Sequence, residues 1–324
     1  MPKPLVVVTR DIPRAGLDVL MGQCETRVHN VDRPMPRAKL LKFVRGADAI
    51  ICCIGDRIDH AVLEAAGPQL KIVAAANIGY DNIDVAACTA RKVLASNAPG
   101  PINVTDVADH AIGLMLSVAR RIPEADRFTR SGKYRFWSIY LMAGRSVAGK
   151  TLGIVGTGRI GSAVAQRAAG FSMPIVYYDA LGKSQPLEEK FGAKFVPLNE
   201  LLHRADFVTI HVPLLPTTRH LIGTKEFRMM KPTAVLVNTS RGPIVDEKAL
   251  VRALKANQIA GAGMDVYENE PKLAAGLAKL KNVVLTPHTA SATLEARNEL
   301  ATGAAKNVLA ALAGQPPPNL VTKQ

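Results

Sequence analysis

The chain has 324 residues, of which 48% are hydrophobic and only 5% are aromatic, and its formal net charge is +14. This length predicts about two domains, each large enough to bury its own core. No apolar run approaches the roughly 18 residues that a membrane span needs, and no signal-peptide pattern precedes the first strand-like run, so we expect a cytoplasmic protein. The Lys and Arg residues are scattered, without basic runs interleaved with aromatics. We therefore do not expect nucleic-acid binding, and attraction of anionic substrates or simple solubility explains the charge.

The four cysteines indicate no metal site. Cys24 and Cys88 are isolated, and Cys52-Cys53 lies inside an apolar run. Adjacent strand residues point to opposite faces, which makes this pair a poor metal clamp. We expect reduced thiols buried in a core.

The first hundred residues alternate strand and helix patterns. Strands are predicted at residues 5–9, 47–53, 70–76 and 93–96, and helices at 13–21 and 59–66. Buried apolar runs that alternate with helices favour a parallel sheet covered on both faces.

Pro99-Gly100-Pro101 interrupts this alternation and is a candidate hinge. From about residue 104 to 121, apolar residues recur at helical spacing. The next segment, 131–144, is irregular and contains Trp137, the only tryptophan. Clustered aromatics without periodicity favour a subunit interface, the alternative being a loop folded onto its own domain.

A second series of strands begins near residue 150. Six parallel strands are predicted, at residues 152–155, 175–178, 207–212, 234–238, 263–266 and 283–286. Six is the number expected of a dinucleotide-binding domain. A long alanine-rich helix is predicted at 291–312, and it should return to the first domain because the second sheet is already complete.

The first strand of this series ends in Gly156-x-Gly158-x-x-Gly161, and a helical pattern follows. In dinucleotide folds such glycines allow the tight turn, the approach of the backbone to the pyrophosphate and the packing of the helix on the strand. The next strand ends at Asp179, at the place where a carboxylate can accept hydrogen bonds from the adenosine ribose. Strand, glycines, helix, strand and acid together predict a dinucleotide site; an ordinary glycine-rich turn is the alternative.

Three polar residues follow later strand ends, where ligands of doubly wound sheets bind: Arg241, Glu270 and His288. The guanidinium of Arg241 matches a carboxylate or keto oxygen, and His288 can transfer a proton near neutral pH. A neighbouring Glu270 would favour the imidazolium and fix its tautomer. Each residue also has a structural explanation, as a surface arginine, a loop acid or a hydrogen-bonded histidine.

At these residues the chain resembles the D-isomer-specific 2-hydroxyacid dehydrogenase family. The resemblance covers most of the chain, and its marks are Gly156-Thr157-Gly158-Arg159-Ile160-Gly161, the segment 211–220 (HVPLLPTTRH), Asn238-Thr239-Ser240-Arg241-Gly242, Gly263-Met264-Asp265-Val266, Glu270-Pro271, the segment 287–293 (PHTASAT) and the segment 77–84 (NIGYDNID). It implies an α/β fold of two doubly wound parallel-sheet domains. A Rossmann NAD(P)-binding domain, residues 100–288, would be inserted in a flavodoxin-like substrate domain formed by residues 1–99 and 289–324.

The resemblance also implies roles for single residues. Arg241 would bind and polarise a 2-oxo acid, His288 would donate the proton, and Glu270 would support His288. The backbone amides of Ile78 and Gly79 would hold the substrate carboxylate. The cofactor would be bound by Gly156, Gly158, Arg159, Ile160, Asp179, Val212, Pro213, Thr218, Thr239, Asp265, His288 and Ala290.

Within the family, the chain looks closest to glyoxylate/hydroxypyruvate reductases and hydroxyphenylpyruvate reductases. The resemblance implies a homodimer, and we expect residues 104–144, with Trp137, to form its interface. Many of these reductases use NADPH, but a carboxylate at Asp179 would repel a 2′-phosphate, so we expect NAD(H) to be favoured over NADP(H). Two other functions are compatible with the fold: a dinucleotide-sensing corepressor-like binding protein, and a formate- or phosphite-type dehydrogenase.

Overall fold

The computed structural model describes residues 2–322. The chain forms two compact units, Met1–Asn103 with Ala292–Gln324, and Val104–Ser291. We call them the first and the second unit. Helix α5 (Pro101–Ala119) begins in the first unit and continues into the second. Pro101 suits the first turn of a helix, where its missing N–H group costs no hydrogen bond, and the helix therefore begins three residues earlier than its apolar periodicity suggests.

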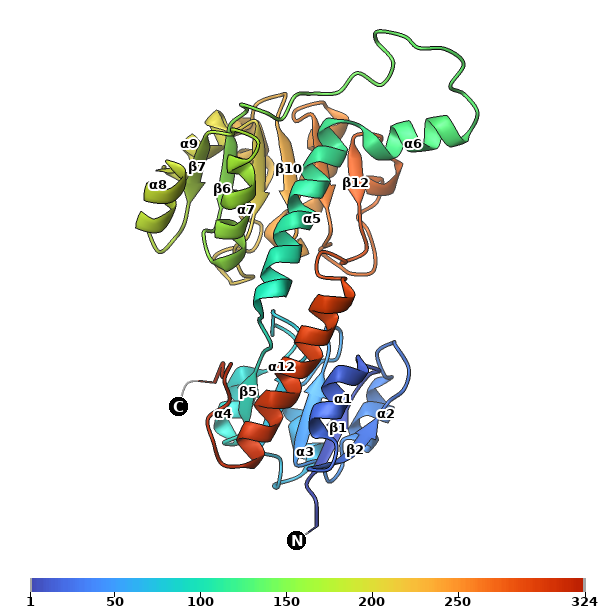
Figure 1. Ribbon diagram of the computed structural model, residues 1–324, viewed down its shortest axis with the longest axis vertical. Coiled ribbons are helices and arrows are strands. Elements are labelled where there is room, and N and C mark those ends of the chain that lie inside the picture. Colours follow the sequence, from blue (N-terminus) through green and yellow to red (C-terminus); the bar gives the residue numbers. More distant parts are fainter. Residues whose placement is uncertain (1, 323–324) are drawn as a thin grey trace. The chain divides into compact units, whose positions relative to one another are not determined.

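The first unit is built on a five-stranded parallel sheet with the order β2-β1-β3-β4-β5, the flavodoxin-like order. Its strands are β1 (Leu5–Val8), β2 (Glu25–Val28), β3 (Ala49–Cys52), β4 (Ile72–Ala75) and β5 (Leu94–Ser96), and its helices are α1 (Arg14–Leu20), α2 (Arg37–Phe43), α3 (His60–Ala66), α4 (Val85–Ala90) and α12 (Leu294–Leu312). Successive strand residues point to opposite faces, so α1 and α12 pack on one face of the sheet and α2, α3 and α4 on the other (Figure 1). The last helix, α12, packs against α1 and the strands of this sheet.

The second unit contains a seven-stranded parallel sheet with the order β12-β11-β10-β9-β6-β7-β8, a Rossmann order with one strand added. Its strands are β6 (Leu152–Val155), β7 (Ile175–Tyr178), β8 (Lys194–Phe195), β9 (Phe207–Ile210), β10 (Val235–Asn238), β11 (Gly261–Met264) and β12 (Val283–Leu285). Besides most of α5, the helices are α6 (Ile122–Arg130), α7 (Arg159–Ala169), α8 (Gln185–Phe191), α9 (Leu198–Arg204), α10 (Thr224–Met229) and α11 (Glu247–Lys255), with short 3-10 turns η1 (Gly242–Ile244) and η2 (Leu277–Lys279). Helices α5, α7 and α8 cover one face, and α9, α10 and α11 cover the other.

These two sheets confirm the predicted fold class of two doubly wound parallel sheets. Two strands are missing from the prediction, β2 and β8, and each lies at the edge of its sheet. In β2 three of the four residues are polar and none is fully buried, and β8 has only two residues. Neither strand is an apolar run, because an edge strand has fewer neighbours to bury it.

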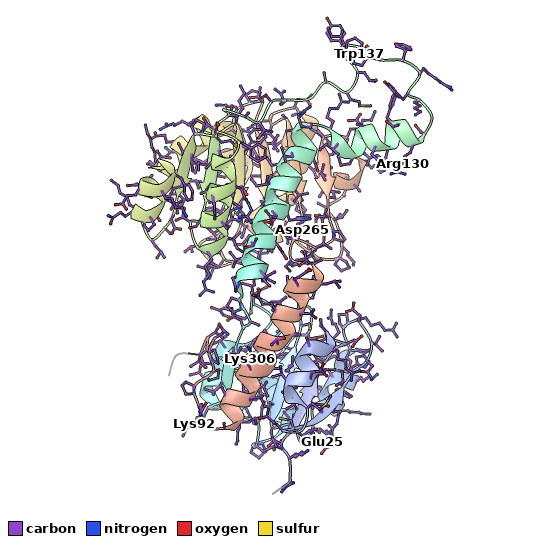
Figure 2. The ribbon with its side chains drawn as sticks, in the orientation of Figure 1. Glu25, Lys92, Arg130, Trp137, Asp265 and Lys306 are labelled. Atoms are coloured by element: carbon purple, nitrogen blue, oxygen red, sulfur yellow. The ribbon has the colours of Figure 1, made fainter. Side chains whose placement is uncertain are left out.

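The segment 131–144 contains no helix or strand and projects from the second unit as an open loop (Figures 1 and 2). Its aromatic side chains are strongly exposed: Phe136 73%, Trp137 76% and Tyr140 84%. Among residues 2–322, no helix is long and apolar enough to cross a membrane.

Candidate functional site

The glycine turn joins β6 to α7 at the middle of the second sheet, where the strand order reverses. Gly156 has a left-handed φ of +94°, and a Cβ atom at Gly161 would lie 2.0 Å from the carbonyl oxygen of Gly156. Only glycine fits at position 161, because the start of α7 packs directly on this turn. No side chain in the described part of the chain caps α7, so its first backbone N–H groups remain available to a phosphate.

Asp179 follows β7 and is tied to the glycine turn. Its Oδ2 accepts hydrogen bonds from the backbone N–H of Thr157 (2.7 Å) and from the Thr157 hydroxyl (2.9 Å), and its Oδ1 accepts one from the N–H of Leu181 (2.9 Å). Partial burial would raise the pKa of Asp179, but these hydrogen bonds outweigh it and hold the pKa below its usual value. The carboxylate is therefore ionised and fixed beside the turn. The contact with Thr157 is not predictable from the glycine spacing.

His288 and Glu270 form a pair beyond the ends of β11 and β12. The Nδ1 of His288 lies 2.9 Å from Oε2 of Glu270, and Oε1 of Glu270 accepts a hydrogen bond from the backbone N–H of Tyr267 (2.9 Å). Burial would raise the pKa of Glu270; the hydrogen bond and charge of His288, and the charge of Arg241, hold it below its usual value. The carboxylate fixes the proton on Nδ1 and leaves Nε2 of His288 for a ligand.

Asp265 anchors the turn that carries His288. It is completely buried, and its carboxylate accepts hydrogen bonds from the Thr286 hydroxyl (2.6 Å), the Thr289 N–H (2.8 Å) and the Ala290 N–H (2.9 Å). Burial would raise the pKa of Asp265, but hydrogen bonds, led by one from His110, lower it. The N–H of His288 also donates to the carbonyl oxygen of Asp265 (2.8 Å), and His288 has a left-handed φ of +55°, an uncommon conformation for a residue other than glycine.

Arg241 lies just beyond β10, and its charge reaches Glu270. The buried Asn238 shapes this turn: its side-chain amide donates to the carbonyl oxygen of Arg241 (3.0 Å) and accepts from the N–H of Ser240 (3.0 Å). A Cβ atom at Gly242 would lie 1.9 Å from the carbonyl carbon of Tyr267, so the Arg241 turn packs tightly against the start of the Glu270 loop. The structure thus brings Arg241, Glu270 and His288 to one edge of the second sheet.

The other residues expected at the cofactor surround this edge. The hydroxyl of Ser240 donates to the carbonyl oxygen of Val212, and the Thr218 hydroxyl donates to that of Pro213 (2.6 Å). Thr239 is buried, and its hydroxyl has no partner among the described residues. Arg159 and Ile160 form the first turn of α7, and Ala290 is bound to Asp265 as described above. Their places beside a cofactor stay predictions.

Ile78 and Gly79, predicted to bind the substrate carboxylate, follow β4 of the first unit. The side-chain amide of Asn97 donates to the carbonyl oxygen of Ile78 (2.6 Å), and that of Asn77 donates to the carbonyl oxygen of Gly79. Within residues 2–322, the N–H groups of Ile78 and Gly79 donate no hydrogen bond. Two adjacent free N–H groups can hold a carboxylate. The two asparagines that fix this loop were missed, because no periodicity marks them. No cluster of His, Cys, Asp or Glu in the described chain can hold a metal ion.

Comparison with known proteins gives consistent similarities. The family model for the NAD-binding domain of D-isomer specific 2-hydroxyacid dehydrogenases matches residues 112–290. A glyoxylate reductase of Thermococcus litoralis is 48% identical over 326 residues, which cover 99% of this chain and 97% of that protein.

Two solved structures extend these similarities to the fold. A protein of Thermus thermophilus is similar in structure with a TM-score of 0.91 and 40% identity, over 98% of this chain and 99% of that one. The NADPH-dependent glyoxylate/hydroxypyruvate reductase of Sinorhizobium meliloti, solved with NADP and malonate, gives a TM-score of 0.83 at 30% identity, over 98% of this chain and 97% of that one. Both similarities cover almost the whole chain.

Proposed function

Because the chain belongs to the D-isomer specific 2-hydroxyacid dehydrogenase family, we propose that it reduces a small 2-oxo acid, such as glyoxylate or hydroxypyruvate, to the D-2-hydroxy acid. The observation that carries this proposal is the His288–Glu270 hydrogen bond, which lies beside Arg241 at the edge of a dinucleotide-binding sheet. The relatives support the substrate class, since one is named glyoxylate reductase and another glyoxylate/hydroxypyruvate reductase.

The residues of this chain fit a nicotinamide cofactor: the turn at Gly161 has no room for a Cβ atom, no described side chain caps the first N–H groups of α7, and Asp179 is fixed beside them. The bound cofactor, when reduced, supplies the hydride to the carbonyl carbon. Arg241 binds the 2-oxo acid and polarises its carbonyl group, since a guanidinium attracts the negative charge that develops on the oxygen.

His288 completes the reaction by proton transfer. Its Nε2–H donates the proton to the carbonyl oxygen, and the ionised Glu270 stabilises the imidazolium until that transfer. The free N–H groups of Ile78 and Gly79 in the first unit are the groups that we expect to hold a carboxylate.

The test is turnover of glyoxylate, hydroxypyruvate and phenylpyruvate with NADH. Positioned proton donors contribute about 10²- to 10⁴-fold, so His288→Ala should lower kcat by at least about 100-fold while NADH still binds. Arg241→Ala should lower kcat/KM comparably. The control is Arg204→Ala, since Arg204 pairs with Glu200 on an exposed helix surface and should not affect the rate. If His288→Ala and Arg241→Ala both kept the rates of the parent, the proposal would be contradicted.

We further propose that NAD(H) is preferred over NADP(H). The carboxylate of Asp179 is ionised and held by Thr157. A carboxylate at this position accepts hydrogen bonds from the ribose hydroxyls, and its negative charge repels a 2′-phosphate. The reductase of Sinorhizobium meliloti is NADPH-dependent, so the preference needs its own measurement. In the parent, the ratio of kcat/KM for NADH to kcat/KM for NADPH should exceed one. In Asp179→Ser this ratio should fall at least about tenfold, which corresponds to a loss of about 1.4 kcal/mol in discrimination between the two cofactors. A parental preference for NADPH would contradict this.

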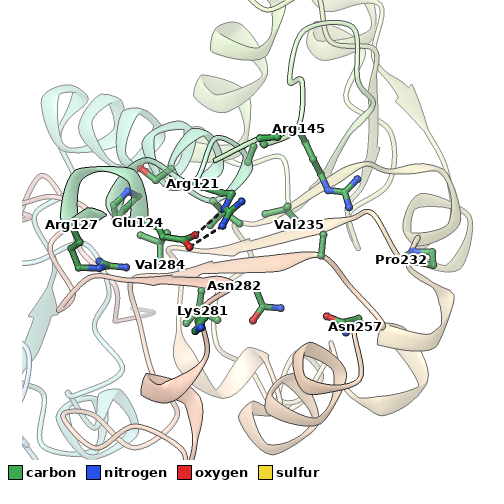
Figure 3. A pocket seen from close by; sticks show the side chains of 18 residues that line it. Arg121, Glu124, Arg127, Arg145, Pro232, Val235, Asn257, Lys281, Asn282 and Val284 are labelled. Atoms are coloured by element: carbon green, nitrogen blue, oxygen red, sulfur yellow. Dashed lines mark hydrogen bonds and ion pairs between the residues drawn. The ribbon is translucent and has the colours of Figure 1, made fainter. Parts of the chain in front are cut away.

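We also propose that the chain forms a homodimer through residues 104–144. The loop 131–144 exposes large aromatic side chains that a single chain leaves in water. At the base of this loop, a cavity of about 720 Å³ is lined by α5, α6 and the starts of β10 and β12 (Figure 3). A second copy would cover both. Light scattering should give twice the chain mass, and Trp137→Ala combined with Tyr140→Ala should weaken the dimer; a parental monomer at micromolar concentration would contradict the proposal.

A further inference from the structure

Glu247 is a buried carboxylate that takes no part in the proposed reaction. It is the first residue of α11 and is only 1% exposed. Its Oε1 accepts a hydrogen bond from the N–H of Glu268 (2.7 Å), and its Oε2 accepts one from the N–H of Ala274 (3.0 Å). One side chain thus holds both ends of the loop that carries Glu270.

A carboxylate suits this position better than other polar groups of the same size. Both of its oxygens accept hydrogen bonds, whereas a glutamine offers one acceptor and would turn its own N–H group toward a second N–H. The choice has a cost, because burial of a negative charge is unfavourable. Burial and the neighbouring acids Glu268 and Glu270 raise the pKa of Glu247, and the two backbone hydrogen bonds oppose this rise. A helix start that needed only packing would not require a buried charge here.

We propose that Glu247 is a positioning residue, which orients Glu270 toward His288 by fixing both ends of the loop that carries Glu270. This inference rests on the proposed function of the His288–Glu270 pair. Glu270 has two anchors: the N–H of Tyr267 on Oε1 and the His288 ring on Oε2. The first anchor belongs to the backbone directly before the segment that Glu247 holds, so loosening that segment moves Glu270 relative to His288.

Several charged and titratable groups face the loop that carries Glu270. Glu270 faces His288 and Arg241, and Glu247 faces Glu268 and Glu270. Glu268 is paired with His220 at 2.8 Å and lies 3.9 Å from Arg219, and the Tyr267 phenol faces both Glu247 and Glu270.

The experiment compares the full-length parent with Glu247→Gln, Glu247→Ala and a control, Asp246→Ala. The control removes the adjacent carboxylate, which only caps the same helix by accepting the Ala249 N–H (2.9 Å). Three quantities are measured: kcat against pH for 2-oxo acid reduction, the Kd of NADH, and the ¹⁵N-histidine NMR signal of His288, assigned with His288→Gln.

If Glu247 positions the pair, Glu247→Gln lowers kcat about 10- to 100-fold, the range for misplaced supporting groups, and leaves the Kd of NADH unchanged. The alkaline limb of the pH profile and the titration of the His288 signal both move to lower pH, because the ring loses its aligned carboxylate. Glu247→Ala shows the same changes more strongly, and Asp246→Ala lowers only the melting temperature.

The proposal is overturned if Glu247→Gln keeps the parental profile, or if it only loses stability as the control does. A different result would contradict the proposed function itself, since the parent would then turn over no 2-oxo acid. The NMR titration still decides the role of Glu247 in that case, because it reports the His288–Glu270 hydrogen bond without turnover.

Discussion

Asp265→Asn tests how the His288 turn is held. In the parent, Oδ1 of Asp265 accepts from the Thr286 hydroxyl and the Thr289 N–H, and Oδ2 accepts from the Ala290 N–H. Asparagine has one acceptor oxygen and one N–H₂ group. The least costly arrangement keeps the oxygen toward Thr286 and Thr289 and turns the amide nitrogen toward the N–H of Ala290.

The magnitude follows from that arrangement. One hydrogen bond to a charged acceptor is lost and one buried N–H is left unpaired, which costs about 2–3 kcal/mol. At about 1.4 kcal/mol per factor of ten, local opening of the turn becomes about 30- to 150-fold more frequent. The effect should be larger at Ala290 than at Thr289, because Thr289 keeps its acceptor.

Hydrogen exchange at residues 286–291 measures this opening directly and does not require two-state unfolding of a two-unit chain. The matched control is Asp206→Asn, since Asp206 binds the N–H of Thr151 and Lys231 elsewhere and should leave the turn unchanged. Equal exchange at Ala290 in parent and variant would refute the reasoning.

The pH dependence has a definite sign. The pKa of Asp265 is lower in the folded chain than in the unfolded chain, so its stabilisation is present above about pH 4 and is lost as the pH falls through the folded value. Protection of the turn in the parent should therefore decline in acid, and Asp265→Asn should lack this decline.

Three further outcomes are expected. Gly242→Ala places a Cβ atom 1.9 Å from the carbonyl carbon of Tyr267, so it should cost about 3 kcal/mol and lower Tm by roughly 6–12 °C; an unchanged melting curve would contradict the close approach. Burial lowers the pKa of His211 to about 3, so its ring should stay neutral from pH 5 to 8 by ¹⁵N NMR, and its contribution to stability should be lost as the pH falls below about 6.5, where only the unfolded chain takes up the proton. Asn97→Ala removes the hydrogen bond to the Ile78 carbonyl and should raise KM for glyoxylate about 5- to 10-fold, about 1 kcal/mol, without changing the Kd of NADH; an unchanged KM would separate this loop from substrate binding.

Much of the candidate site could be predicted because parallel strands share one carboxyl edge. The glycine turn after β6 and Asp179 after β7 come from two neighbouring strands, and Arg241 and His288 follow two others in the same sheet. Once these apolar runs are recognised as parallel strands, we can predict that their carboxyl ends lie at the same edge of the sheet without knowing any long-range contact. The roles of these residues in binding and catalysis stay predictions until the variants are measured.

The supporting contacts could not be predicted. Asp265 binds N–H groups 24 and 25 residues further along the chain, and Glu247 binds N–H groups 21 and 27 residues away. Local periodicity gives no signal for such pairs. Even the edge strands β2 and β8 were missed for a related reason, since their partners rather than their own hydrophobicity hold them in the sheets.

The sequence by itself determined the alternation of buried strands and helices, the glycine turn and the edge at which polar residues gather, because each depends on neighbours within a few residues. Only the tertiary structure decided which carboxylates fix that edge: Asp265 under the turn of His288, Asp179 against Thr157, and Glu247 at both ends of the Glu270 loop. The physical reason is that a buried carboxylate is stable only where several N–H or O–H groups converge on it, and folding alone brings those groups together.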